Sequence, residues 1–291
     1  MENAAGSLQV KAMGRQQAGG YANEAFFDAQ NDRWVVFSWL GGGLHGSVDC
    51  RNDVGIVMPG CWWGAQSLPR VVALQPDGQT VKFPVVPEME KLLVGPGSSA
   101  DVTLKMAGDN AKSLGNTSRV GPQSRVRVSA NISVMSATDK RWAGSFGVDV
   151  LPRALHSPCT ATTWDAGKCL ATRVSISRLS DKDGKSAITV LKLQAMHAPG
   201  GQEGGVSLEV PYALAYTFDI WIDRGVVEVY GDGGAQVLVA KTGITSEPDP
   251  LALRAWATGP ADSTSEVAVR VLIHPVKSSV FKSDPGPWNP T

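Results

Sequence analysis

Apolar and polar residues alternate one by one along much of the chain. From 125 to 134, arginine, serine and asparagine occupy the odd positions, and valine, alanine and isoleucine occupy the even ones. The stretches 171–179 and 266–273 repeat this pattern. A two-residue period is that of a β-strand with one buried face, so we expect antiparallel strands whose polar side faces solvent. Arg125 and Arg127 would then lie on a solvated strand face.

Turn residues separate these stretches and indicate the fold class. The chain has 32 glycines and 18 prolines among its 291 residues, and a short helical turn near Pro87–Leu92 is the one helix that the pattern suggests. Many short strands joined by tight turns are typical of sandwiches, barrels and propellers. The sequence therefore predicts an all-β protein.

Charge and hydropathy exclude several classes of partner. Basic and acidic residues number 27 each, so the basic excess that nucleic acids and anionic membranes attract is missing. No apolar run is long enough for a transmembrane helix, and residues 1–20 lack the apolar core of a signal peptide. We therefore expect no nucleic-acid partner and no membrane.

Two regions of the chain differ in their pattern of strand candidates and loops. Residues 20–86 contain four strand candidates, at 21–27, 34–40, 67–74 and 80–85, with a long loop at 41–64. Four strands are the content of one propeller blade, which is stable only when it packs on something else. Residues 90–291 have enough strands for a two-sheet antiparallel sandwich. We expect residues 1–19 to be disordered.

The four cysteines form two local pairs, Cys50 with Cys61 and Cys159 with Cys169. Two disulfides in a secreted protein and four buried thiols both fit this spacing. No C-x-x-C pair or other ligand cluster indicates a metal site, and no glycine-rich phosphate loop is present, so we expect no metal and no cofactor.

Three segments, in order, resemble the C-terminal part of glycoside hydrolase family 32, the β-fructofuranosidases, inulinases and levanases. The first is YANEAFFD at 21–28 with RWVVFSW at 33–39. The second is WGAQSLPR at 63–70, and the third is FDIWIDRGVVEVY at 218–230. The resemblance implies the last blade of a propeller at 20–86 and the C-terminal sandwich at 90–291. The resemblance is strongest with fungal members of the family, and it implies that the protein is extracellular.

The same resemblance implies that the chain lacks a catalytic site. The family takes its nucleophile from a W-M-N-D-P-N-G motif, its acid/base from E-C and a stabilising Asp from R-D-P, and none of these occurs here. Retaining hydrolysis needs two carboxyl groups about 5–5.5 Å apart. We therefore expect a fragment or late-starting chain that is inactive alone and has no catalytic residue of its own.

Sugar contact is the role that the chain could still carry. Sugar rings stack on exposed aromatic side chains, and the final blade of the family borders the fructose pocket. We expect substrate contacts from Tyr21, Glu24, Trp62 and Trp63, and we assign Trp34 and Trp39 to the core between blades. The partners expected are fructose-containing carbohydrate and the missing propeller blades.

Three further expectations follow. Glu228 is interpreted as a solvent or inter-domain contact.

A blade without its neighbouring blades would expose apolar surface around Val35, Phe37 and Val72. We therefore expect residues 88–291 to be more soluble alone than the full chain is. The alternative functions are a non-catalytic, lectin-like carbohydrate-binding sandwich and a β-rich interaction module without a sugar role.

Overall fold

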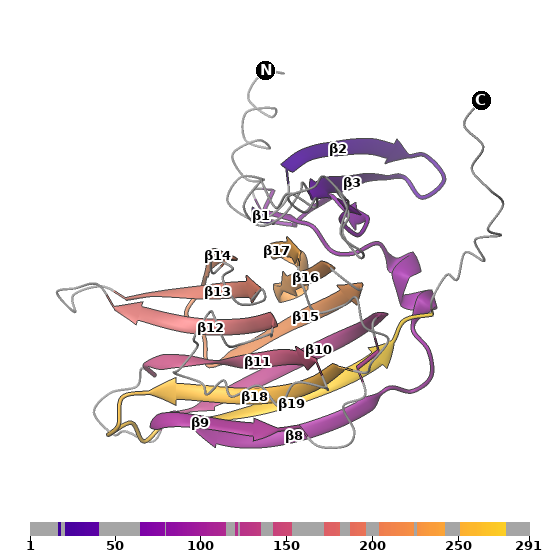
Figure 1. The fold of residues 1–291 in the computed structure, drawn as a ribbon. Helices are drawn as coiled ribbons and strands as arrows, with labels where there is room; N and C mark the ends of the chain where they lie inside the picture. The colour runs from indigo at the N-terminus through magenta and orange to yellow at the C-terminus, as the bar shows by residue number, and fades with distance from the viewer. Residues whose placement is uncertain are drawn as a thin grey trace, which may run out of the picture.

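The computed structural model of the chain is built almost entirely from strands (Figure 1), which confirms the all-β prediction. Among the described residues, no helical segment has the length and apolar character that crossing a membrane requires. The residues that the structure describes are 17–18, 21–40, 65–78, 80–114, 120–121, 123–134, 142–152, 172–180, 187–195, 204–223, 226–241 and 251–277.

Two large sheets stack as a sandwich, as predicted. Apart from the parallel pairing of β1 with β17, neighbouring strands in both sheets are antiparallel. The seven-stranded sheet runs in the order β1 (Gln17–Ala18), β17 (Gln236–Lys241), β16 (Val226–Gly231), β15 (Ala215–Asp223), β10 (Gln123–Ser133), β19 (Glu266–Pro275) and β8 (Ser98–Lys105). The six-stranded sheet runs in the order β14 (Gly204–Val210), β13 (Ala187–Ala195), β12 (Thr172–Ser180), β11 (Gly144–Pro152), β18 (Leu251–Gly259) and β9 (Gly108–Ser113).

The main core lies between these two sheets and follows the predicted alternation. On β10, Val126, Val128, Ala130 and Ile132 are all buried, and the inward valines of β19 meet them from the neighbouring strand. Each strand therefore contributes every second side chain to one apolar layer, which is the arrangement expected when strands pack face to face.

The polar faces of the sandwich depart from the expectation, because several of their residues are buried. Arg125 is covered, whereas Arg127 two residues later is exposed. On the six-stranded sheet, Arg173, Ser175 and Asp149 are buried on the outer face. Alternation specifies which side chains share a face, but it does not specify whether another part of the chain covers that face.

A smaller sheet precedes the sandwich. Its central strand β3 (Arg33–Leu40) pairs with β2 (Tyr21–Asp28) on one side and with β4 (Ala65–Gln66) and β5 (Arg70–Val71) on the other. The chain then forms a hairpin of β6 (Ala73–Leu74) and β7 (Val81–Lys82). Residues after β7 return to the small sheet, where the amide of Val71 donates to the carbonyl of Pro84 at 2.8 Å. This gives a four-stranded sheet of β2, β3, β4 and β5 beside the β6–β7 pair, and its assignment to a propeller blade stays a prediction. We keep the name blade for residues 20–86.

The blade packs on the outer face of the seven-stranded sheet through a second apolar cluster. Val36, Val81 and Phe83 from the blade are buried against the sandwich side chains Trp221, Val226, Tyr230, Val237 and Val239. Val35 is also buried, so the prediction that it forms exposed surface is wrong. The predicted bounds 20–86 and 90–291 stay predictions, because the two parts share this cluster.

A short 3-10 helix of six residues links the blade to the sandwich. The 3-10 helix η1 (Pro87–Leu92) has proline at its first position, where the missing amide proton costs nothing. This is the short helical turn that the sequence predicts at these residues. At the opposite end of the blade, the turn η2 (Asp232–Gly234) touches Phe83, whose amide donates to the carbonyl of Gly234 at 2.8 Å.

Candidate functional site

The predicted sugar-contact residues are only partly described. Glu24 lies exposed on β2, opposite Phe37 of β3. Tyr21 begins β2, but its side chain, like Trp62 and Trp63, lies outside the described residues. All four cysteines also lie outside them, so the substrate contacts and the disulfides both stay predictions.

Exposed aromatic side chains gather on the β2–β3 hairpin. Phe27 and Trp34 face each other across the strands, with ring centroids 5.6 Å apart, and are 48% and 53% exposed. Trp39 is 40% exposed, so the assignment of Trp34 and Trp39 to the core is wrong for this chain. Phe26, 51% exposed, stacks on Phe37 with centroids 6.2 Å apart. We call Phe26, Phe27, Trp34 and Trp39 the hairpin aromatics.

The hairpin aromatics point to both faces of the hairpin. Side chains alternate between faces along a strand, so neighbouring Phe26 and Phe27 lie on opposite sides, as do Trp34 and Val35. A strand pair that is apolar on both faces is typical of a sheet covered on both sides. The sequence signal was therefore present in RWVVFSW, which lacks a polar face. In the part of the chain that the structure describes, the hairpin aromatics of this strand pair remain 40–53% exposed.

The acidic residues beside the hairpin are held in ion pairs. Arg33 contacts Asp28 at 2.9 Å and Glu88 at 2.8 Å. Hydrogen bonds from Asn31 and then from Arg33 lower the pKa of the Asp28 carboxyl, and Arg33 lowers the pKa of Glu88. A carboxyl group with a lowered pKa is a poor proton donor near neutral pH. These residues therefore fasten the hairpin to η1.

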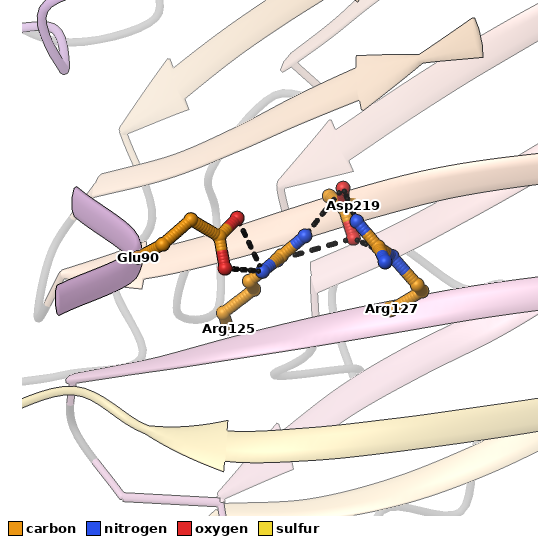
Figure 2. A network of polar contacts seen from close by, with 4 residues as sticks. All are labelled: Glu90, Arg125, Arg127 and Asp219. Carbon is orange, nitrogen blue, oxygen red and sulfur yellow. Dashed lines mark hydrogen bonds and ion pairs between the residues drawn. The ribbon is translucent and has the colours of Figure 1, made fainter. Parts of the chain in front are cut away.

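A second polar network fastens η1 to the sandwich (Figure 2). Both oxygens of Glu90 accept from Nη1 of Arg125, at 2.7 and 2.6 Å, and Asp219 accepts from both Arg125 and Arg127. The guanidinium of Arg125 also lies 5.4 Å from the ring centre of Trp221. Arg125 is buried because Glu90 and η1 lie over this part of β10, which the strand pattern could not indicate.

A buried carboxyl joins the blade to the sandwich directly. Oε1 of Glu228 accepts from the backbone amide of Leu68 at 2.6 Å, and Oε2 accepts from the hydroxyl of Tyr230 at 2.7 Å. The side chain is 3% exposed. The structure therefore agrees with the inter-domain interpretation of Glu228, and the side chain is not a solvent-exposed one. Among the described residues, no group of three or more metal-ligating side chains gathers.

Comparisons with known proteins identify the fold. No protein-family model and no curated protein matches the chain. Solved structures match it: fructan 1-exohydrolase IIa from Cichorium intybus has a TM-score of 0.61 at 15% identity, over 91% of this chain and 49% of that one. An exo-inulinase from Aspergillus awamori matches with 0.52 at 17% identity, over 89% and 43%. A glycoside hydrolase family 32 structure from Bifidobacterium adolescentis matches with 0.51 at 18%, over 90% and 32%.

These matches establish a shared fold. The identities are too low to carry function, but the two-sheet sandwich and preceding four-stranded sheet are those of family 32 structures. The chain spans half or less of the length of these structures.

Proposed function

We propose that this chain is the last-blade and sandwich part of a family 32-type protein that acts on sucrose or fructans, and that it is catalytically incomplete alone. The three ordered sequence motifs and the structural likeness support this proposal. The proposal also places the protein outside the cell, by analogy, and assigns the catalytic carboxylates to a propeller part that the 291 residues do not contain.

The observation that carries the proposal is the pair of apolar faces on the β2–β3 hairpin. Both faces carry exposed aromatics, although a strand pair with this composition is ordinarily covered on both sides. Further propeller blades, packed face to face on this hairpin, would supply the missing cover. We propose these blades as the partner of the hairpin aromatics.

Removing two hairpin aromatics is expected to weaken association of the chain. The double substitution Phe26→Ser and Trp39→Ser removes two large apolar groups, each worth about 1.5–3 kcal/mol when buried. In the isolated chain, we expect these uncovered aromatics to cause self-association, as exposed apolar patches do. Measured by sedimentation velocity, this self-association should weaken about tenfold or more in the double variant. The matched control is Leu179→Ser with Ile188→Ser, an exposed apolar pair on β12 and β13 of the sandwich. Equal weakening in the control would refute a specific role for the hairpin.

Sugar contacts are proposed at the mouth of the pocket that the blade would border. Tyr21, Glu24, Trp62 and Trp63 are the residues assigned to this role, with fructose-containing sugars as ligands. In this account the contacts become complete only when the propeller blades are present. Isolated chain should therefore bind fructo-oligosaccharides weakly or not at all.

A second candidate is a lectin-like carbohydrate-binding protein. The exposed Phe27–Trp34 pair favours it, because accessible aromatic rings are the surfaces on which sugar rings stack. One experiment separates the candidates: the purified chain is assayed for fructose release from sucrose, inulin and levan, and is titrated with fructo-oligosaccharides by calorimetry. Saturable heat that Trp34→Ala abolishes, without fructose release, would favour the lectin-like function.

A further inference from the structure

Glu228 is a buried carboxyl that bridges the blade and the sandwich from inside the junction. It extends from β16, accepts from the amide of Leu68 in the blade and from Tyr230 of its own strand, and is almost fully buried. Val36, Val237 and Val239 belong to the apolar cluster of the same junction. A charged carboxylate in such surroundings loses most of its hydration, and this is costly unless a partner charge is in contact.

The charge of Glu228 has no such partner in contact with it. Arg70 is fully buried in the same junction, but its Nη2 donates to the hydroxyls of Ser38 and Ser67, and its Nε and Nη1 have no hydrogen-bond partner. Among the described residues, no ion pair joins Arg70 to Glu228, so the arginine acts on it only at longer range. Burial therefore raises the pKa of the Glu228 carboxyl, while Arg70, Tyr230 and the Leu68 amide partly oppose this.

Glu228 also lines a pocket of about 140 Å³ at the junction, which gives its carboxyl a route for proton exchange. Its charged lining residues besides Glu228 are Asp223 and Lys277, and the negative charge of Asp223 raises the pKa of Glu228 further. Two apolar residues of η1, Met89 and Leu92, also line the pocket. The carboxyl can therefore exchange protons with solvent while the junction stays closed.

We propose that Glu228 makes the junction between blade and sandwich a pH-sensitive latch, which tightens as the carboxyl takes up a proton. In the neutral carboxyl one oxygen would still accept from Leu68, and the other would donate its proton to the Tyr230 oxygen, so that the Tyr230 hydroxyl proton turns away from it. Protonation thereby removes the desolvated charge at the expense of the bond that the Tyr230 hydroxyl donates. Because the folded state holds this proton more tightly than the unfolded chain does, the stabilisation is complete below the ordinary glutamate pKa. It disappears as the pH rises through the folded-state value.

Protonation of Glu228 would therefore also change how firmly the blade holds the hairpin aromatics in place. Leu68 follows β4, which pairs with β3 of the hairpin, so a firmer bond at Leu68 restrains the strand that supports these side chains. This inference rests on the junction alone and stands whether or not the proposed sugar function is correct.

The test is hydrogen exchange at the Leu68 amide of the full chain, corrected for intrinsic rates, at about pH 8 and about pH 5. We expect protection to rise about tenfold or more at the lower pH in the unmodified protein. Glu228→Gln, which mimics the neutral carboxyl, should be well protected at both pH values. The control Glu90→Gln removes an exposed carboxyl of η1 and should keep the full response.

A second variant keeps the inference testable if Glu228→Gln does not fold. Tyr230→Phe removes a donor to the carboxylate, so the response should move to higher pH. An unchanged response in Tyr230→Phe would overturn the latch. So would a Glu228→Gln protein whose Leu68 protection changes with pH as in the unmodified chain.

Discussion

A polypeptide of residues 88–291 is expected to be less stable and less soluble than the full chain. Removing the blade uncovers a cluster of five large side chains on the seven-stranded sheet, and burying each such side chain stabilises by about 1.5–3 kcal/mol. The loss should be on the order of 5 kcal/mol or more, which is comparable with the whole stability of an ordinary domain. The side chains uncovered are Trp221, Val226, Tyr230, Val237 and Val239.

The measurement is urea unfolding of both polypeptides, with binding of a hydrophobic-surface dye as a second readout. Residues 65–291 provide a comparison, since they keep Leu68, Val81 and Phe83 over the sandwich and, like residues 88–291, lack β1 and the hairpin. We expect their unfolding midpoint to fall between the other two. If residues 88–291 match the full chain in midpoint and dye binding, the blade contributes nothing to the sandwich. The sequence-based expectation differs from both results, because it has residues 88–291 more soluble than the full chain.

The second large effect is expected at Asp149, on the outer face of the six-stranded sheet. Its fully buried carboxylate contacts Arg173 at 2.7 Å and Arg254 at 2.7 Å, and Arg173 also lies 4.0 Å from the ring centre of Trp256. Asp149→Ala leaves two guanidinium groups without their shared anion in a buried setting. Breaking a buried pair in this way costs about 3–5 kcal/mol.

Urea unfolding near neutral pH should detect this loss. The control is Asp101→Ala, which removes an exposed partner of Arg270 at 3.8 Å and should change stability by about 0–1 kcal/mol. A loss at Asp149 no larger than that at Asp101 would mean that solvent already compensates the two arginines.

Much of the fold could be predicted from the sequence because strand alternation is a local signal. The inward residues of β10, the helical turn at Pro87–Leu92 and the first two strands of the blade were expected and are present. The strand expected at 67–74 is divided into β5 and β6, and within 80–85 only Val81–Lys82 is a strand. The confirmed features depend on a two-residue period and on turn-forming residues close in sequence.

The covering of strand faces could not be predicted, because it depends on contacts between distant segments. Arg125 has the same pattern as Arg127 but is buried, since Glu90 of η1 contacts it across 35 positions of sequence. Glu228 meets Leu68 across 160 positions. Trp34 and Trp39 were assigned to a core between blades from the family resemblance, and in the structure both are exposed.

Two sets of residues on the blade concern different partners, sugar for one and protein for the other. Glu24 is exposed on β2, where a ligand can reach it. Tyr21, Trp62 and Trp63 rest on the family resemblance, whereas the hairpin aromatics rest on exposure and strand register. The two sets are testable separately, since the first concerns sugar and the second concerns protein packing.

The most direct test of catalytic incompleteness is fructose release by the purified full chain from sucrose, inulin and levan. The sequence contains none of the three acidic motifs, and the two carboxyls beside the hairpin, Asp28 and Glu88, are held by Arg33. We predict no fructose above that of a heat-inactivated sample, at any pH from acidic to neutral. Sustained release at a rate of about 1 per second or faster, as for an ordinary enzyme, would contradict the account.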